Sequence, residues 1–186
     1  MKHIIAMKLQ WIFVIAMAEQ NPQLLLRRIR LLVMAFIIGL VLSGVTAFPL
    51  EWELNLLAHW LGAPPNALPQ NYSGLLFWIV TVRNGLRQTN ADFPFMAYGT
   101  EWLAFGHLVI ATAFIGPLRE PVRNKWIVDW GLIACAGVLP LALICGPLRG
   151  IPFYWRVIDC SFGIIGAIPL LMIRKWISEL EKLERQ

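Results

Sequence analysis

The sequence predicts an all-α integral membrane protein, a bundle of four membrane-spanning helices with an outer cap of short interfacial helices. Of the 186 residues, 58% are hydrophobic and only 15% are charged, whereas soluble domains are about half apolar and about a quarter charged. Four stretches are apolar over a length that can cross the hydrocarbon layer of a bilayer. The basic residues gather on one side of those stretches, as integral membrane proteins require. We expect a single membrane domain over residues 1–186.

The four predicted spans are long apolar runs separated by polar segments. The first contains an uncharged run of twenty residues from Leu31 to Leu50, enough to cross roughly 30 Å of hydrocarbon. The next two runs are Trp102–Leu118 and Trp130–Leu148, and the last begins at Cys160. We therefore expect transmembrane helices over residues 29–48, 94–116, 126–145 and 154–174.

Residues 50–92 are predicted to form the outer cap. Helical spacing puts Glu51, Asn55 and His59 on one face of a first short helix, with apolar residues around the rest. A second helix, near residues 72–86, has an uncharged apolar core too short to span, so an interfacial or re-entrant position is expected. A proline-rich loop separates the two.

The positive-inside rule decides between four and five spans. With four spans and both ends cytoplasmic, the Lys and Arg residues divide twelve to four, and a fifth span over residues 72–87 would reduce this to nine against seven. The rule favours four. The cytoplasmic set is Lys2, Lys8, Arg27, Arg28, Arg30, Arg119, Arg123, Lys125, Arg174, Lys175, Lys182 and Arg185, and the outer set is Arg83, Arg87, Arg149 and Arg156. The net charge of +5 is then explained by orientation and lipid headgroups, and no nucleic-acid partner is expected.

Both ends of the chain need separate interpretation. Residues 1–20 fit a helix lying on the membrane, a lead-in that precedes a natural start at Met17, or a secretory signal ending in Ala16-Met17-Ala18. The charge bias opposes the third. Residues 175–186 alternate in charge sign and are expected to form a cytoplasmic helical tail, whose apolar stripe would meet the membrane or a partner.

The tetrapeptide Gly-Pro-Leu-Arg occurs twice, at residues 116–119 and 146–149, and in each case an aspartate follows ten residues after the arginine. A glycine in the left-handed conformation can end a helix, and proline then prevents its continuation. We expect two helix hairpins, each closed by an ion pair, Arg119 with Asp129 and Arg149 with Asp159. One span separates the copies, so they should face opposite sides of the membrane. Inverted repeats also occur in transporters, so that class stays open.

The candidate functional site is a pocket at the outer leaflet. Ionisable residues within apolar segments are functional candidates by default. Glu101 and His107 are the candidates for acid–base catalysis, and a structural hydrogen bond is the competing interpretation of His107. The predicted ligand-binding residues are Glu101, His107, Arg149, Trp155, Arg156, Asp159, Tyr98 and His59.

The best functional hypothesis is binding of a lipid-like or small amphiphilic ligand in that pocket, at the cell membrane. A membrane enzyme acting on an apolar substrate, an accessory or scaffold subunit, and an oligomeric transporter are the alternatives, and assembly into a homo-oligomer or a larger complex is left open. No P-loop, GxSxG, HExxH, CxxC or dinucleotide fingerprint is present. No metal or cofactor is expected. A disulfide between Cys145 and Cys160 is a further open alternative.

Overall fold

The computed structural model describes residues 21–185, and the interpretations of residues 1–20 lie outside this range. The described residues form helices joined by loops, with no strand, and four of the helices are long and apolar enough to cross a membrane. These are Pro22–Thr46, Pro94–Arg119, Lys125–Leu148 and Phe153–Glu184, in place of the expected 29–48, 94–116, 126–145 and 154–174. The all-helical class and the number of candidate spans are confirmed.

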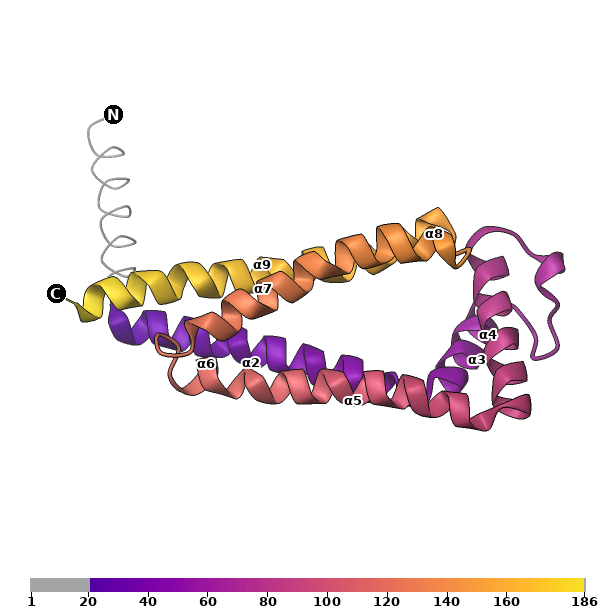
Figure 1. Ribbon diagram of the computed structural model, residues 1–186, viewed down its shortest axis with the longest axis horizontal. Coiled ribbons are helices and arrows are strands. Elements are labelled where there is room, and N and C mark those ends of the chain that lie inside the picture. The colour runs from indigo at the N-terminus through magenta and orange to yellow at the C-terminus, as the bar shows by residue number, and fades with distance from the viewer. Residues whose placement is uncertain (1–20, 186) are drawn as a thin grey trace, which may run out of the picture. The chain divides into compact units, whose positions relative to one another are not determined.

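The helices follow the chain in the order shown in Figure 1. The principal ones are α2 (Pro22–Thr46), α3 (Leu50–Trp60), α4 (Gly74–Asp92), α5 (Ala97–Ala113), α6 (Ile115–Arg119), α7 (Lys125–Pro140), α8 (Gly146–Leu148) and α9 (Phe153–Glu184). Short turns complete the set, namely η1 (Pro69–Asn71), η2 (Pro94–Met96) and the π-helical η3 (Leu141–Cys145). Contacts divide the chain into two compact units, unit 1 with residues 21–37 and 113–185 and unit 2 with residues 38–112.

Unit 1 packs α6, α7, α9 and the first half of α2. Its core is made of fully buried aliphatic side chains and one aromatic ring, that of Phe114. Gly131 of α7 lets the helices approach, because a Cβ there would lie 2.9 Å from the Phe114 ring and 3.0 Å from Leu170. Further along α9, a Cβ on Gly163 would lie 2.5 Å from the carbonyl oxygen of Cys135. Small residues permit this close contact between apolar helices.

The C-terminal stripe is part of this core. Ile177 is fully buried and Leu180 is 4% exposed, and the helix α9 continues through the predicted tail to Glu184. For Ile177 and Leu180 the expectation that the stripe would meet the membrane or a partner is therefore wrong, whereas Trp176 and Leu183 of the same stripe are half-buried. The start of α7 lies beside this part of α9, since Lys125 pairs with Glu181 at 3.2 Å.

Unit 2 packs α3 against α4, and α5 against the last part of α2. Ala104 and Ala111 form a buried small-residue face of α5. Gly44 of α2 lies against this face, where a Cβ would come within 2.9 Å of the Ala104 carbonyl oxygen and 3.2 Å of the His107 Cβ. The cap helices occur where expected, although α4 runs on to Asp92 and is longer than predicted.

Candidate functional site

The cap of unit 2 is held together by arginines of α4 that bind backbone carbonyls of the proline-rich loop. Arg83 is only 1% exposed and donates to the carbonyl oxygens of Pro64 at 3.1 Å and Ala67 at 3.4 Å, and to Asn84 Oδ1 at 3.1 Å. Asn84 Nδ2 also donates to Ala67 O, at 2.9 Å. Neutral oxygens thus solvate a buried cation, whose own hydrogen-bonding requirement is met without a carboxylate.

Burial has an electrostatic consequence for Arg83, which lies outside the four candidate spans. Desolvation lowers the pKa of its guanidinium, and the nearby Arg87 lowers it further. A guanidinium nevertheless stays charged in proteins because its ordinary pKa is so high. Arg83 is therefore a buried structural cation that fixes the loop onto α4.

Arg87 and Asn90 connect α4 to α3. Arg87 donates from Nη1 to Pro65 O at 3.0 Å and from Nη2 to Asn55 Oδ1 at 2.6 Å, and its Nε lies 3.7 Å from Glu51 Oε1. Asn90 Nδ2 donates to Glu51 Oε2 at 2.8 Å. The polar face predicted on the first cap helix therefore meets a polar face of α4. The same helical spacing, applied to Arg83, Arg87 and Asn90, would have revealed that second face from the sequence.

A pocket of about 380 Å³ lies beside this network, entirely within unit 2. Its polar lining comes from Glu51, Asn55, Asn90 and Thr100. Its apolar lining is Phe48, Pro49, Leu50, Trp52, Leu86 and Ala97. Polar and apolar walls in one cavity suit a molecule with a polar end and a hydrocarbon part.

Four of the predicted site residues belong to unit 2, and none of them lines this pocket. Tyr98 and Glu101 are exposed on α5, and the Tyr98 ring makes an edge contact with Trp102 at 6.0 Å between centroids. His59 is exposed in the last turn of α3. His107 is half-buried, and its Nδ1 lies 3.0 Å from the Leu103 carbonyl oxygen of its own helix. This geometry fits the structural interpretation of His107, and a catalytic role stays a prediction.

The other four predicted site residues belong to unit 1, at the end that holds α8 and the start of α9. Arg149 caps α8 and is exposed. Arg156 lies with its Cζ 5.3 Å from the centre of the Phe153 ring, a cation–π geometry, and its Nε is buried without an acceptor among the residues that the structure describes. Trp155 and Asp159 are half-buried. The single pocket predicted from all eight residues, drawn from both units, stays a prediction.

The expected ion pairs of the two Gly-Pro-Leu-Arg segments do not form. Asp129 pairs with Arg174 of α9, at 2.5 Å between Oδ1 and Nε, because α9 runs beside α7 and brings Arg174 closer than Arg119. Among residues 21–185, Arg149 and Asp159 form no ion pair within 4 Å. Cys145 and Cys160 are free thiols, so the structure does not support the disulfide.

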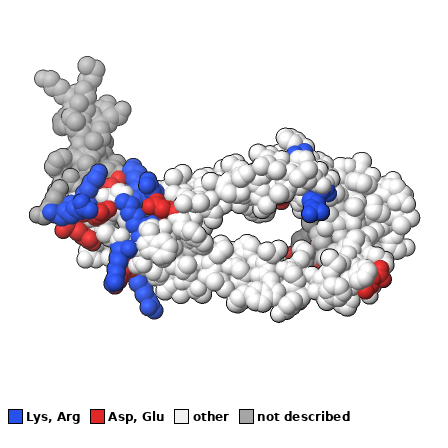
Figure 2. Space-filling model, viewed as in Figure 1, with Lys and Arg blue, Asp and Glu red and all other residues white. Residues whose placement is uncertain are grey.

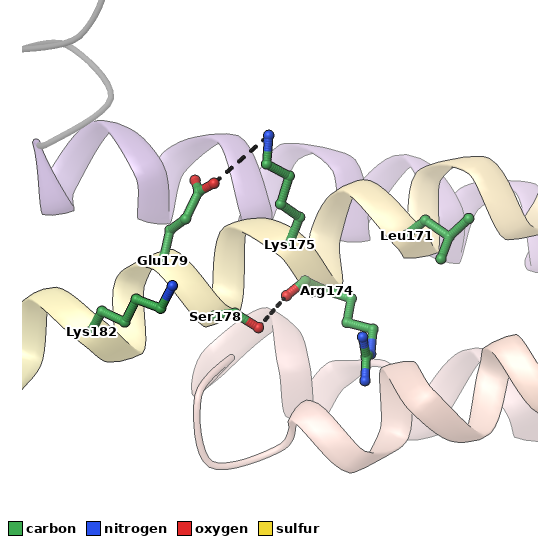
Figure 3. A pocket seen from close by; sticks show the side chains of 6 residues that line it. All are labelled: Leu171, Arg174, Lys175, Ser178, Glu179 and Lys182. Carbon is green, nitrogen blue, oxygen red and sulfur yellow. Dashed lines mark hydrogen bonds and ion pairs between the residues drawn. The ribbon is translucent and has the colours of Figure 1, made fainter.

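Charged side chains of unit 1 gather where α9 ends beside the α6–α7 loop (Figure 2). A second pocket, of about 390 Å³, lies here (Figure 3). Its described lining comes from α9 alone: Leu171, Arg174, Lys175, Ser178, Glu179 and Lys182. Lys175 pairs with Glu179 at 3.8 Å, and Ser178 donates to the Arg174 carbonyl oxygen at 3.0 Å. Two of its cations already have carboxylate partners, Lys175 with Glu179 and Arg174 with Asp129, so we regard the cap pocket as the better candidate.

Comparison with known proteins adds no functional information, because no family model, curated protein or solved structure matches the chain. Within residues 21–185, no three His, Cys, Asp or Glu side chains lie close enough together to hold a metal ion. The geometry of the cap pocket is therefore the feature that indicates a function.

Proposed function

We propose that this protein binds the polar end of a lipid-like or small amphiphilic molecule in the cap pocket of unit 2. The observation behind the proposal is the division of the pocket wall. Glu51, Asn55, Asn90 and Thr100 form its polar part, and aromatic and aliphatic side chains form the rest. A volume of about 380 Å³ lies within the range of small-molecule sites and suits a headgroup with the first part of a chain.

The network behind the pocket supports the proposal because it preorganises the wall. Arg87 and Asn90 of α4 hold Glu51 and Asn55 of α3 in place through side-chain contacts, and Arg83 fixes the loop to α4. A wall that is already ordered loses little conformational entropy when a ligand binds.

The proposed topology puts both termini in the cytoplasm of a multi-pass protein in the cell membrane and the cap at the outer leaflet. The twelve-to-four division of basic residues supports this orientation. In a cysteine-free background, Arg123→Cys and Arg149→Cys should react oppositely with a membrane-impermeant maleimide in intact cells, with only position 149 labelled. Equal labelling of both positions before lysis would contradict the orientation.

Photolabelling tests the binding proposal. A dodecyl amphiphile with a diazirine near its headgroup should, in lipid nanodiscs, label residues that line the cap pocket. Ala97→Phe fills the pocket and should remove most of this labelling. Gly99→Phe is the matched control, because Gly99 is exposed and a Cβ there would have nothing within 4 Å. Labelling that avoids the pocket residues, or that Ala97→Phe leaves intact, would overturn the proposal.

A further inference from the structure

The hydrogen-bond donors and acceptors of the cap pocket differ in whether they already have a partner. Asn90 Nδ2 already donates to Glu51 Oε2, and Thr100 Oγ1 donates to the Ala97 carbonyl oxygen at 2.7 Å. Arg87 directs both Nη groups away from Glu51, toward Pro65 O and Asn55 Oδ1. The Asn90 and Thr100 donors of the wall and the Arg87 Nη donors behind it are therefore engaged.

Two acceptors lack a close donor. Glu51 Oε1 has Arg87 Nε at 3.7 Å, which is longer than a hydrogen bond. Asn90 Oδ1 is buried and has no hydrogen-bond partner among the described residues. The orientation of this amide follows from Glu51, since rotating it would place two acceptor oxygens against each other. A buried acceptor without a donor is unfavourable, so a ligand that donates a hydrogen bond would satisfy Asn90 Oδ1.

The charge of the pocket wall also favours a ligand that donates hydrogen bonds. The Glu51 side chain is 36% exposed beside the pocket, so a carboxylate faces whatever enters. Arg87 Nε pairs with this carboxylate at 3.7 Å, but both Nη groups of Arg87 bind other oxygens, so an anionic headgroup would meet the Glu51 charge with no Nη group left to bind it. A headgroup with N–H or O–H groups would supply the missing donors, and hydrogen bonds to a carboxylate are stronger than those to neutral acceptors.

We infer that the ligand of the cap pocket has a headgroup rich in hydrogen-bond donors, either a primary ammonium or hydroxyl groups, and that Glu51 receives them. This inference rests on the proposed function. It assigns a chemical class to the polar end of the amphiphile. It also predicts discrimination by donor number and not by positive charge alone.

Competition against the photoreactive amphiphile tests the inference with four dodecyl probes of matched chain length. Dodecylamine and monolauroylglycerol have donors, whereas dodecyltrimethylammonium has the positive charge without N–H groups and dodecanesulfonate is a donor-free anion. The two donor-bearing probes should displace the label at concentrations at least about tenfold lower than the other two. The ratio between dodecylamine and monolauroylglycerol identifies whether ammonium or hydroxyl is preferred.

Substitutions of Glu51 then test whether its carboxylate causes the preference for donor-bearing probes. Glu51→Gln should weaken competition by dodecylamine about tenfold, and Glu51→Asp, which keeps the charge, should retain the order of the four probes. Glu53→Gln is the matched control, since Glu53 lies on the same helix but does not line the pocket.

Each failure has a distinct meaning. Displacement by dodecyltrimethylammonium at the concentrations needed for dodecylamine would overturn the inference, as would equal effects of Glu51→Gln and Glu53→Gln. In both cases specific labelling of the pocket would leave the proposed function standing. Absence of specific labelling in the pocket would instead reject the proposed function itself.

Discussion

The two Gly-Pro-Leu-Arg segments have the same sequence and are closed in different ways. The first lies in α6, and Asn124 closes it by donating from Nδ2 to the carbonyl oxygens of Gly116 at 3.2 Å and Glu120 at 2.9 Å. The second lies in α8 and the residue that follows it, where backbone N–H groups close the turn. The N–H of Ile151 donates to Gly146 O at 3.0 Å and that of Gly150 to Pro147 O at 3.1 Å, the pattern of a Schellman motif.

The difference shows that the repeated tetrapeptide does not determine its own turn. We expected Gly116 and Gly146 to adopt the left-handed conformation, and this is wrong, because among the described residues only Gly62, Gly74 and Gly150 have a positive φ. Both Gly-Pro pairs lie inside short helices. The residues that follow decide the closure, an asparagine in the first segment and a left-handed glycine in the second.

The glycines of the two segments differ most in what they contact. A Cβ on Gly146 would lie 2.5 Å from Arg156 Cδ and 2.8 Å from its Cγ, whereas a Cβ on Gly116 would lie 3.0 Å from the end of the Asn124 side chain. Gly146→Ala should therefore lower the free energy of unfolding by about 2 kcal/mol and Gly116→Ala by less than about 1 kcal/mol. Reversible unfolding in mixed micelles measures both values.

A double-mutant cycle sharpens this comparison. In an Arg156→Ala background the Gly146→Ala change should have little further effect, because the atoms that it would displace are gone. Gly137→Ala serves as the control, since a Cβ there meets nothing within 4 Å. Equal losses for Gly146→Ala and Gly116→Ala would show that Arg156 does not lie against Gly146.

The left-handed position should matter only in the second segment. Gly150 has a φ of 69°, so Gly150→Ala should lower the free energy of unfolding by about 1.5 kcal/mol. Glu120 occupies the equivalent position after the first segment with a φ of −129°, and Glu120→Ala should change the stability by no more than about 0.5 kcal/mol. A tolerant Gly150→Ala variant in the same unfolding assay would argue against the Schellman motif.

The asparagine should matter only in the first segment. Asn124→Ala removes the donor from two carbonyl oxygens and should lower the free energy of unfolding by about 1 kcal/mol. Asn124→Asp keeps the size of the side chain but has no N–H to donate, so the free energy of unfolding should fall by at least as much. Faster amide exchange at the end of α6, with α8 unchanged, would locate the effect. No change at α6 in either variant would contradict the assigned bonds.

The smallest expected effect concerns the aspartate that follows the first segment. Asp129 pairs with Arg174 while both side chains are about half exposed, so Arg174→Ala should lower the free energy of unfolding by about 0.5 kcal/mol. Arg119→Ala should have less effect, since the contact that the structure gives Arg119 is its carbonyl oxygen accepting from Arg30 Nη2 at 3.4 Å. Double-mutant cycles test the pairing. A coupling energy between Asp129→Asn and Arg119→Ala, with none between Asp129→Asn and Arg174→Ala, would contradict the structure and favour the pair expected from the sequence.

The candidate site was less predictable than the spans. Glu51 and Asn55 were placed on one polar face from the sequence, and that face borders the pocket. The eight predicted ligand-binding residues do not line it, because an ionisable residue in an apolar segment indicates where charge lies along the chain and not which cavity it faces. Arg83 and Arg87 contribute to the predicted topology only as outer charges, although Arg83 is the most deeply buried charged side chain described. Two of its three acceptors are backbone carbonyls, which leave no mark in a sequence.

The sequence by itself determined the helical class, four candidate spans and the short helices of the cap. These depend on the length and apolar character of continuous segments, and such local properties need no knowledge of partners. Only the tertiary structure decided that Asp129 meets Arg174, that Arg156 requires Gly146, and that Arg83 holds the loop. Each of these contacts joins residues on separate elements, and the free energy that selects one partner over another arises only when those elements pack together.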